Sequence, residues 1–190
     1  LLDPQVVLGL FLWQYGACYD PAYLWWNPYN EIDVEFSRWG NPGNDIAQFV
    51  AQPYDTPGNI HRFAATFASG EITSHAFRWL EDRVEYRSWR GGPGSESPGN
   101  LIQSWTYTGP HIPRPEQPRV HINLWRIGGA PAADQEVILD GFTFVPDGPV
   151  SGVPGLPPSG FRLPSLAPAT PSPFRLFTAI RYTMTAPGKA

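Results

Sequence analysis

The sequence of 190 residues is poor in cysteine and lysine, with one of each, Cys18 and Lys189. A single cysteine excludes a disulfide framework within the chain and a zinc site built from several cysteines. No stretch approaches the ~18 consecutive apolar residues that a transmembrane helix needs. Charged residues make up only 16% of the chain and hydrophobic ones 42%, a composition typical neither of disordered chains nor of coiled coils.

Negative charge is absent from the last part of the chain, because all 17 acidic residues lie before residue 151. The same stretch has nine arginines, which gives it a formal charge of −8, whereas residues 151–190 carry +4. An acidic body is poorly suited to binding a phosphate backbone. We therefore expect neither a nucleic acid nor a membrane as partner.

Proline and glycine are abundant, with 23 and 19 residues, and aromatic residues make up 14%. Apolar runs and alternating stretches are short and are separated by turn residues about every ten positions, and no segment has a convincing helical period. This pattern predicts an all-β protein, a sandwich or a barrel. The expected strands are 6–13, 31–36, 46–50, 62–67, 74–79, 83–89, 101–107, 120–125 and 136–145.

The composition changes after Pro146, and residues 151–190 contain eight prolines. We therefore predict a β domain over residues 1–147 and a Pro-rich, disordered tail over residues 148–190. Within the tail, residues 174–184 have the composition of a short strand or an interaction segment.

The most informative segment is Glu31-Ile32-Asp33-Val34-Glu35-Phe36. Side chains alternate across a strand, so the three carboxylates form a row on one face and the three apolar side chains face the other way. Carboxylates this close raise at least one pKa, because ionising all of them in a cleft is costly. One protonated and one ionised carboxyl group is what the cleavage of a glycosidic bond requires.

Two other interpretations of the row are a solvated strand face and a divalent-cation site. The surrounding sequence favours a sugar site, because Trp and Tyr side chains stack on sugar rings and offer hydrogen-bonding groups. None of the four histidines is spaced like a metal ligand, and Cys18 lacks a catalytic partner motif. The aromatic residues near the row are Trp25, Trp26, Tyr29 and Trp39.

The row resembles the active-site strand of glycoside hydrolase family 16, the family of laminarinases and lichenases. His121-Ile122-Asn123-Leu124-Trp125 resembles that family's N-L-W strand. The resemblance keeps its order along the chain and covers roughly residues 3–146. Further similar segments are 7–11, 47–49, 74–79, 84–90 and 141–145.

This resemblance implies a β-jelly-roll sandwich (concanavalin-like) whose active cleft lies on a concave face. It makes Glu31 the nucleophile, Asp33 the assisting carboxylate and Glu35 the general acid/base, roles that the spacing alone leaves open. It also implies hydrolysis of a polysaccharide, most simply a β-1,3- or β-1,3-1,4-glucan, in an extracellular or periplasmic setting. No cofactor is implied beyond a structural Ca²⁺. The implied substrate-binding residues are Trp25, Trp26, Tyr29, Gln48, Asn123 and Trp125.

The chain also departs from the family. Strands that normally precede the segment 7–11 are missing, and Arg90-Gly91 replaces a hairpin aspartate. The chain begins with Leu1-Leu2-Asp3 and shows no signal peptide, so we expect residues 1–190 to be a fragment or the product of a damaged gene. The alternative to a glycosidase is a non-catalytic carbohydrate-binding jelly roll, or an inactive fragment of such an enzyme.

Overall fold

The computed structural model of the protein describes residues 2–13, 30–113, 119–144, 165–166 and 182–183. The chain divides into two compact units, Leu1–Ala133 and Asp134–Ala190. The described residues form an all-β structure of antiparallel sheets, without an α-helix among them. Over the same residues, no helix is long and apolar enough to cross a membrane.

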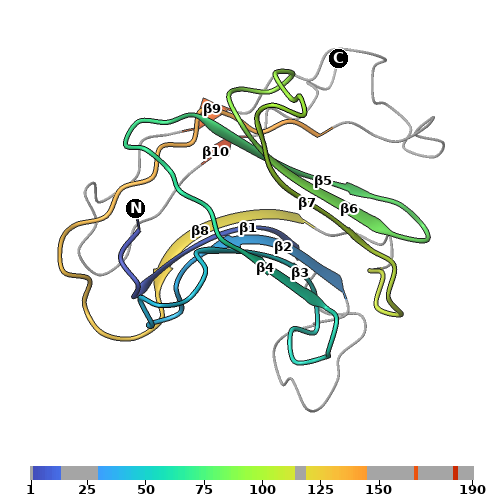
Figure 1. The fold of residues 1–190 in the computed structure, drawn as a ribbon, viewed down its shortest axis with the longest axis horizontal. Coiled ribbons are helices and arrows are strands. Elements are labelled where there is room, and N and C mark those ends of the chain that lie inside the picture. The colour runs from blue at the N-terminus through green and yellow to red at the C-terminus, as the bar shows by residue number, and fades with distance from the viewer. Residues whose placement is uncertain (1, 14–29, 114–118, 145–164, 167–181, 184–190) are drawn as a thin grey trace. The chain divides into compact units, whose positions relative to one another are not determined.

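The first unit contains a five-stranded antiparallel sheet in the order β4-β3-β2-β1-β8. Neighbouring strands along the chain pair as hairpins, whereas β8 returns from far along the chain to pair with β1. The sheet is curved, and its concave face points away from the other sheet of this unit (Figure 1). Its strands are β1 (Val6–Trp13), β2 (Glu31–Phe36), β3 (Ala47–Ala51), β4 (Ile60–Phe63) and β8 (Arg119–Arg126).

The second sheet of the first unit is a three-stranded meander of β5 (Thr73–Trp79), β6 (Val84–Arg90) and β7 (Leu101–Tyr107). It packs on the convex face of the five-stranded sheet through an aromatic core. The rings of Phe49 and Tyr86 stack with their centroids 5.0 Å apart, and Tyr86 Oη donates to the Val50 carbonyl at 2.7 Å. Two antiparallel sheets packed in this way form a β-sandwich of the jelly-roll kind.

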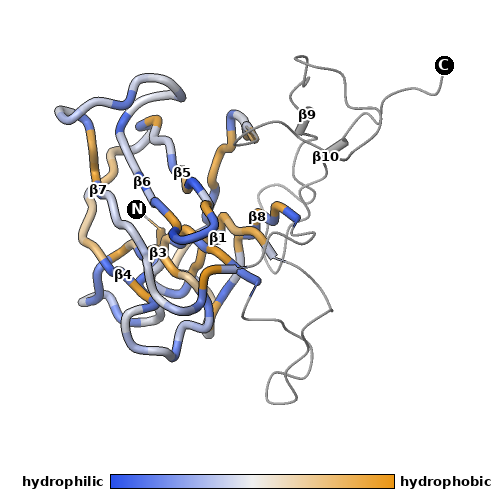
Figure 2. The backbone as a smooth tube through the Cα atoms, turned by 90° about the vertical axis from the view of Figure 1, so that its right-hand side faces the viewer, coloured by the Kyte–Doolittle hydropathy of each residue, from blue (hydrophilic) through white to orange (hydrophobic). Residues whose placement is uncertain are grey.

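Seven of the nine expected strands form, with bounds within one residue of the prediction. β1 is a continuous apolar run whose first four residues are buried, and β2 alternates apolar and acidic residues. The hydrophobic stretches lie mostly along strands and the hydrophilic ones mostly in the connections between them (Figure 2). Between β2 and β3, Asn41 and Gly43 make a tight turn in which the Gly43 amide donates to Asn41 Oδ1 at 2.9 Å.

Two expected strands differ from the structure. The prediction of a strand over 136–145 is wrong for its described part, because residues 134–144 have no regular secondary structure. Its hydropathy suits a strand, but a strand also needs hydrogen bonds to a neighbouring strand, and the described part of this segment joins no ladder. The expected strand 62–67 is instead β4, Ile60–Phe63, since only these residues lie opposite β3 in the ladder.

In the second unit, β9 (Ser165–Leu166) and β10 (Tyr182–Thr183) pair antiparallel. β10 lies within the segment 174–184, whose composition is that of a short strand or an interaction segment. The expected boundary between residues 147 and 148, and most of the expected tail, lie outside the described residues.

Candidate active site

β2 presents its three carboxylates on the concave face of the five-stranded sheet. On the opposite face Ile32 and Val34 are 1% and 2% exposed and belong to the core between the sheets. The carboxylate of Asp33, in the middle of the row, is buried with 2% of the residue exposed, whereas Glu31 and Glu35 are partly exposed. The row therefore combines a buried carboxyl group with two that solvent reaches.

Burial, followed by the charges of Glu31 and Glu35, raises the pKa of Asp33 well above its ordinary value. A hydrogen bond with the Glu31 side chain raises this pKa further. In the opposite sense, Gln52 Nε2 donates to Asp33 Oδ2 at 2.8 Å and lowers the pKa. Asp33 therefore keeps its proton to a higher pH than a solvated aspartate does.

Glu35 is held from the neighbouring strand. Gln48, opposite it on β3, donates from Nε2 to Glu35 Oε2 at 2.7 Å. Behind Gln48, Arg62 of β4 donates from Nε to Gln48 Oε1 at 3.2 Å. Burial raises the pKa of Glu35, while the bond from Gln48 and the charge of Arg62 oppose the rise. Its pKa is therefore shifted in the direction that a general acid requires.

On the other side of β2, the residue of β1 opposite Glu35 is a glycine. Gly9 lies opposite Glu35 and Asn123 lies opposite Gly9, so these three positions form one line across the concave face. A Cβ atom at Gly9 would lie 2.6 Å from Asn123 Oδ1. The missing side chain therefore allows the Asn123 amide to lean over β1 on the side of the row.

Two aromatic contacts lie on the same concave face. Opposite Asp33, Phe11 of β1 stacks on His121 of β8 with ring centroids 5.2 Å apart. Two positions beyond Asn123, Trp125 is 39% exposed and meets Trp39 edge-on at 6.3 Å. Trp39 has a φ of 51°, a left-handed backbone conformation that bulky residues rarely adopt.

The structure thus brings together six of the nine site residues predicted from the sequence. Those on one face are Glu31, Asp33, Glu35, Gln48, Asn123 and Trp125. The other three, Trp25, Trp26 and Tyr29, lie outside the described residues, as does Cys18.

The sequence analysis missed Gly9, Gln52 and Arg62. Gln52 follows Gln48 by four residues, a spacing that places two side chains on the same face of an extended segment. Arg62 could have been found only from the register of the β3–β4 hairpin, because its spacing from Gln48 depends on the connecting loop.

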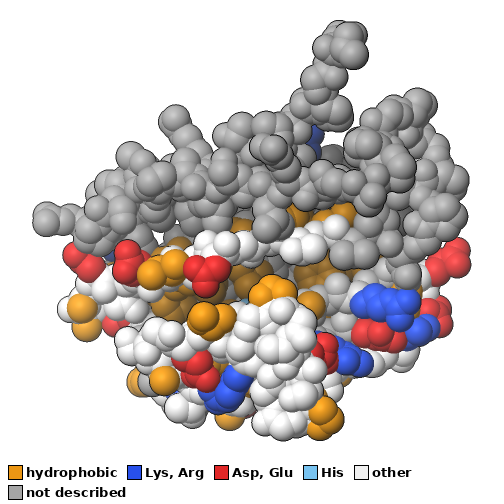
Figure 3. Space-filling model, turned by 90° about the horizontal axis from the view of Figure 1, so that it is seen from above, with side chains coloured by type: hydrophobic (Ala, Val, Ile, Leu, Met, Phe, Trp, Pro, Cys, Tyr) orange, Lys and Arg blue, Asp and Glu red, His pale blue; other side chains and the backbone are white. Residues whose placement is uncertain are grey.

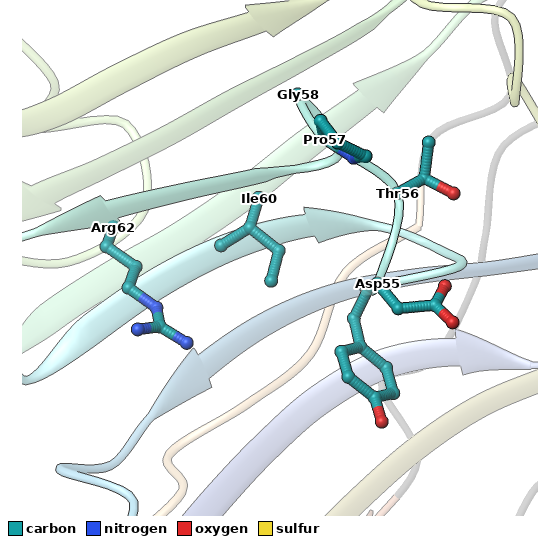
Figure 4. Close-up of a pocket in the computed structure, with 7 residues that line it drawn as sticks. Asp55, Thr56, Pro57, Gly58, Ile60 and Arg62 are labelled. Carbon is teal, nitrogen blue, oxygen red and sulfur yellow. The ribbon is translucent and has the colours of Figure 1, made fainter.

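A pocket of about 410 Å³ lies at the β4 edge of the five-stranded sheet, and none of the three carboxylates lines it. It lies under the β3–β4 connection, and Ile60 and Arg62 point into the same space from β4 (Figure 4). Arg62 thus lines the pocket and also reaches the Glu35 side of the row through Gln48. The lining residues are Tyr54, Asp55, Thr56, Pro57, Gly58, Ile60 and Arg62.

The face shown in Figure 3 intersperses acidic, basic and hydrophobic side chains over its described part, rather than presenting a continuous basic surface. Among the described residues, no group of three or more His, Cys, Asp or Glu is arranged to hold a metal ion.

Comparison with known proteins adds no relative. No family model matches the chain, and neither the curated proteins nor the solved structures contain a match.

Proposed function

We propose that the protein is a retaining endo-β-glycosidase of the family 16 type that cleaves a polysaccharide, most simply a β-1,3- or β-1,3-1,4-glucan. The observation that carries the proposal is the environment of the row. A buried carboxyl group with a raised pKa lies between two accessible glutamates, and two glutamine amides, Gln48 of β3 and Gln52 just after it, hold the row. A solvated strand face would leave its middle carboxylate exposed, whereas Asp33 is buried.

In the proposed reaction, the Glu31 carboxylate attacks the anomeric carbon while Glu35 gives its proton to the departing glycosidic oxygen. The carbon–oxygen bond of the glycoside breaks as the ester to Glu31 forms. Glu35, now ionised, then takes a proton from a water molecule that displaces Glu31 from the same carbon. Two displacements leave the configuration of the anomeric carbon unchanged.

Asp33 supports this cycle by its protonation state. When protonated, it donates a hydrogen bond to Glu31 without adding a second full negative charge beside the nucleophile. Gln52, the residue that follows β3, holds Asp33 in place. Exposed Trp125 and the Asn123 amide offer a ring surface and hydrogen-bonding groups for sugar units next to the row.

The test is hydrolysis of laminarin and lichenan by the full chain, compared with Glu31→Gln and Glu35→Gln. We expect the wild type to release reducing sugar with retained anomeric configuration, read by proton NMR of the fresh product. Both variants should fold and lose activity by about 10³-fold or more. Formate added to Glu31→Ala should restore cleavage of an aryl β-glucoside, because formate can fill the space of the missing carboxylate.

Wild-type protein that binds these glucans without cleaving them would instead identify the carbohydrate-binding jelly roll. If cleavage persists in Glu31→Gln at the wild-type rate, the assignment of the row is wrong.

A further inference from the structure

Arg62 begins a chain of hydrogen bonds that ends on Glu35. Its Nε donates to Gln48 Oε1 at 3.2 Å, and Gln48 Nε2 donates to Glu35 Oε2 at 2.7 Å. The three residues lie on adjacent strands, opposite one another in the ladder. We propose that Arg62 is a positioning residue, which acts through the Gln48 amide to fix the oxygen of Glu35 that carries the acid/base proton. This deepens the proposed function and rests on it for the catalytic role of Glu35.

The chain has only one chemically consistent direction. A guanidinium can donate hydrogen bonds but cannot accept them, so the atom of Gln48 that faces Arg62 must be its carbonyl oxygen. The amide nitrogen of Gln48 then faces Glu35 and donates to Oε2. A proton on Oε2 would point at the N–H of Gln48. Protonation of Glu35 therefore takes place at Oε1, the oxygen that the relay leaves unused.

Asp33 is held by an arrangement of the same kind. The Tyr54 backbone N–H donates to Gln52 Oε1 at 2.7 Å, and Gln52 Nε2 donates to Asp33 Oδ2 at 2.8 Å. Here a backbone N–H, which also can only donate, sets the direction of the amide. Two glutamines on one side of the row thus present donors to two carboxylates. The donor to Gln52 belongs to the backbone, so a side-chain substitution can remove only the donor to Gln48, which is Arg62.

Other charged and titratable groups on this face determine what Arg62 adds. Along β2, Asp33 lies next to Glu35 in the row and Glu31 lies beyond Asp33, and β8 carries His121 and Arg119 two strands away. The described positions opposite Glu35 on β1 and β3 are uncharged, namely Gly9 and Gln48. On β4, Arg62 is exposed, and its charge lowers the pKa of Glu35.

Replacing Arg62 by methionine would remove this charge and free the Gln48 amide to turn over. A turned amide presents its carbonyl oxygen to Glu35 Oε2 and draws the proton to that oxygen, facing β3. The loss of the charge and the turned amide both raise the pKa of Glu35. The turned amide also places the proton on the oxygen that faces β3, from which it does not reach a bound glycosidic oxygen. Lysine in place of Arg62 keeps a cation and a donor, so Arg62→Lys should restore both properties.

The experiment compares wild type, Arg62→Met and Arg62→Lys, with Arg78→Met as the control for loss of an exposed arginine on β5. The Glu35 carboxyl is titrated by carbon-13 NMR, with its resonance assigned by loss in Glu35→Gln, and the pH profile of kcat/KM is recorded on laminarin. In Arg62→Met we expect Glu35 to titrate at higher pH and the alkaline limb of the profile to move with it. We also expect kcat to fall about tenfold to a hundredfold.

Arg62→Lys and Arg78→Met should lie close to wild type in all three measurements. Titration of Glu35 at the wild-type pH in Arg62→Met would overturn the relay, whatever the activity. A shifted titration in a protein whose wild type cleaves no glucan would support the relay and overturn the proposed function. The NMR readout therefore separates the two hypotheses.

Discussion

At the scale of single residues, two histidines that face the interior of the sandwich differ in how their ring nitrogens are satisfied. His61 on β4 stacks on Trp105 at 5.5 Å, and its buried Nε2 has no hydrogen-bond partner. His75 on β5 contacts Thr73 Oγ1 and Ser88 Oγ, both at 2.9 Å. An unsatisfied buried polar atom costs stability. A ring whose pKa is lowered by burial, as that of His75 is, makes stability depend on pH.

Replacing His61 by phenylalanine should stabilise the fold. The new ring keeps the stack with Trp105 and removes the unsatisfied Nε2, so we expect the free energy of unfolding to rise by about 1 kcal/mol. Urea denaturation followed by circular dichroism measures the change. The control is His111→Phe, which loses the contact of His111 Nδ1 with Asn59 Nδ2 at 3.1 Å and should destabilise. A loss of stability in His61→Phe would show that Nε2 is satisfied in solution.

His75 should make the fold less stable in mild acid. Burial lowers the pKa of His75 from its ordinary 6.5 to about 4, so between these values the unfolded chain binds a proton that the folded chain does not. The stabilisation that neutral His75 gives the folded state is fully present above pH 6.5 and is lost as the pH falls towards 4. The loss is at most about 3 kcal/mol. Unfolding free energies at pH 7 and pH 4.5 should differ less in His75→Gln than in wild type. Equal differences in the two proteins would contradict this assignment.

At the scale of elements, β1 and β2 show what the sequence can specify. The continuous apolar run of β1 and the strict alternation of β2 predict the bounds of both strands without error. The first pattern is typical of a strand buried on both faces and the second of a strand buried on one face, so the sequence itself records them. β4 and the segment 136–144 were misjudged, because pairing with a neighbouring strand decides them and composition does not record it. The same limit applies to the site. The β2 carboxylates share one segment, whereas Arg62 joins them only through the register of two ladders.

The space above Gly9 on β1 should be needed for function and not for folding. In Gly9→Ala, the new Cβ would lie 2.6 Å from Asn123 Oδ1 and would push the amide away from the row. We expect the variant to fold normally, because Asn123 is exposed and can move, and to lose about tenfold in kcat/KM on laminarin. Hydrolysis rates of Gly9→Ala, Asn123→Ala and the double variant measure the coupling. The double variant should be no worse than Asn123→Ala, and independent, additive losses would refute the mechanism.

At the scale of the whole molecule, the first unit depends on contacts between its two sheets. Two tyrosines of the three-stranded sheet reach across with their hydroxyl groups, Tyr86 to the Val50 carbonyl and Tyr107 to Asn59 Oδ1, at 2.7 and 2.8 Å. Val50 is the partner of Asp33 in the β2–β3 ladder. The packing of the sheets is therefore tied to the strand pair that holds the carboxylate row.

Substitution of Tyr86 tests this dependence. Tyr86 is 1% exposed and its ring stacks on Phe49, so Tyr86→Phe keeps the packing and removes only the bond to Val50. We expect a loss of about 1 kcal/mol in Tyr86→Phe and about 4 kcal/mol in Tyr86→Ala, which also leaves a cavity. Tryptophan fluorescence, which includes Trp89 and Trp105 of the three-stranded sheet, should change over the same urea range as hydrogen exchange of the β2 amides. Separate transitions would show that the five-stranded sheet, and the row with it, can stay folded when the other sheet opens.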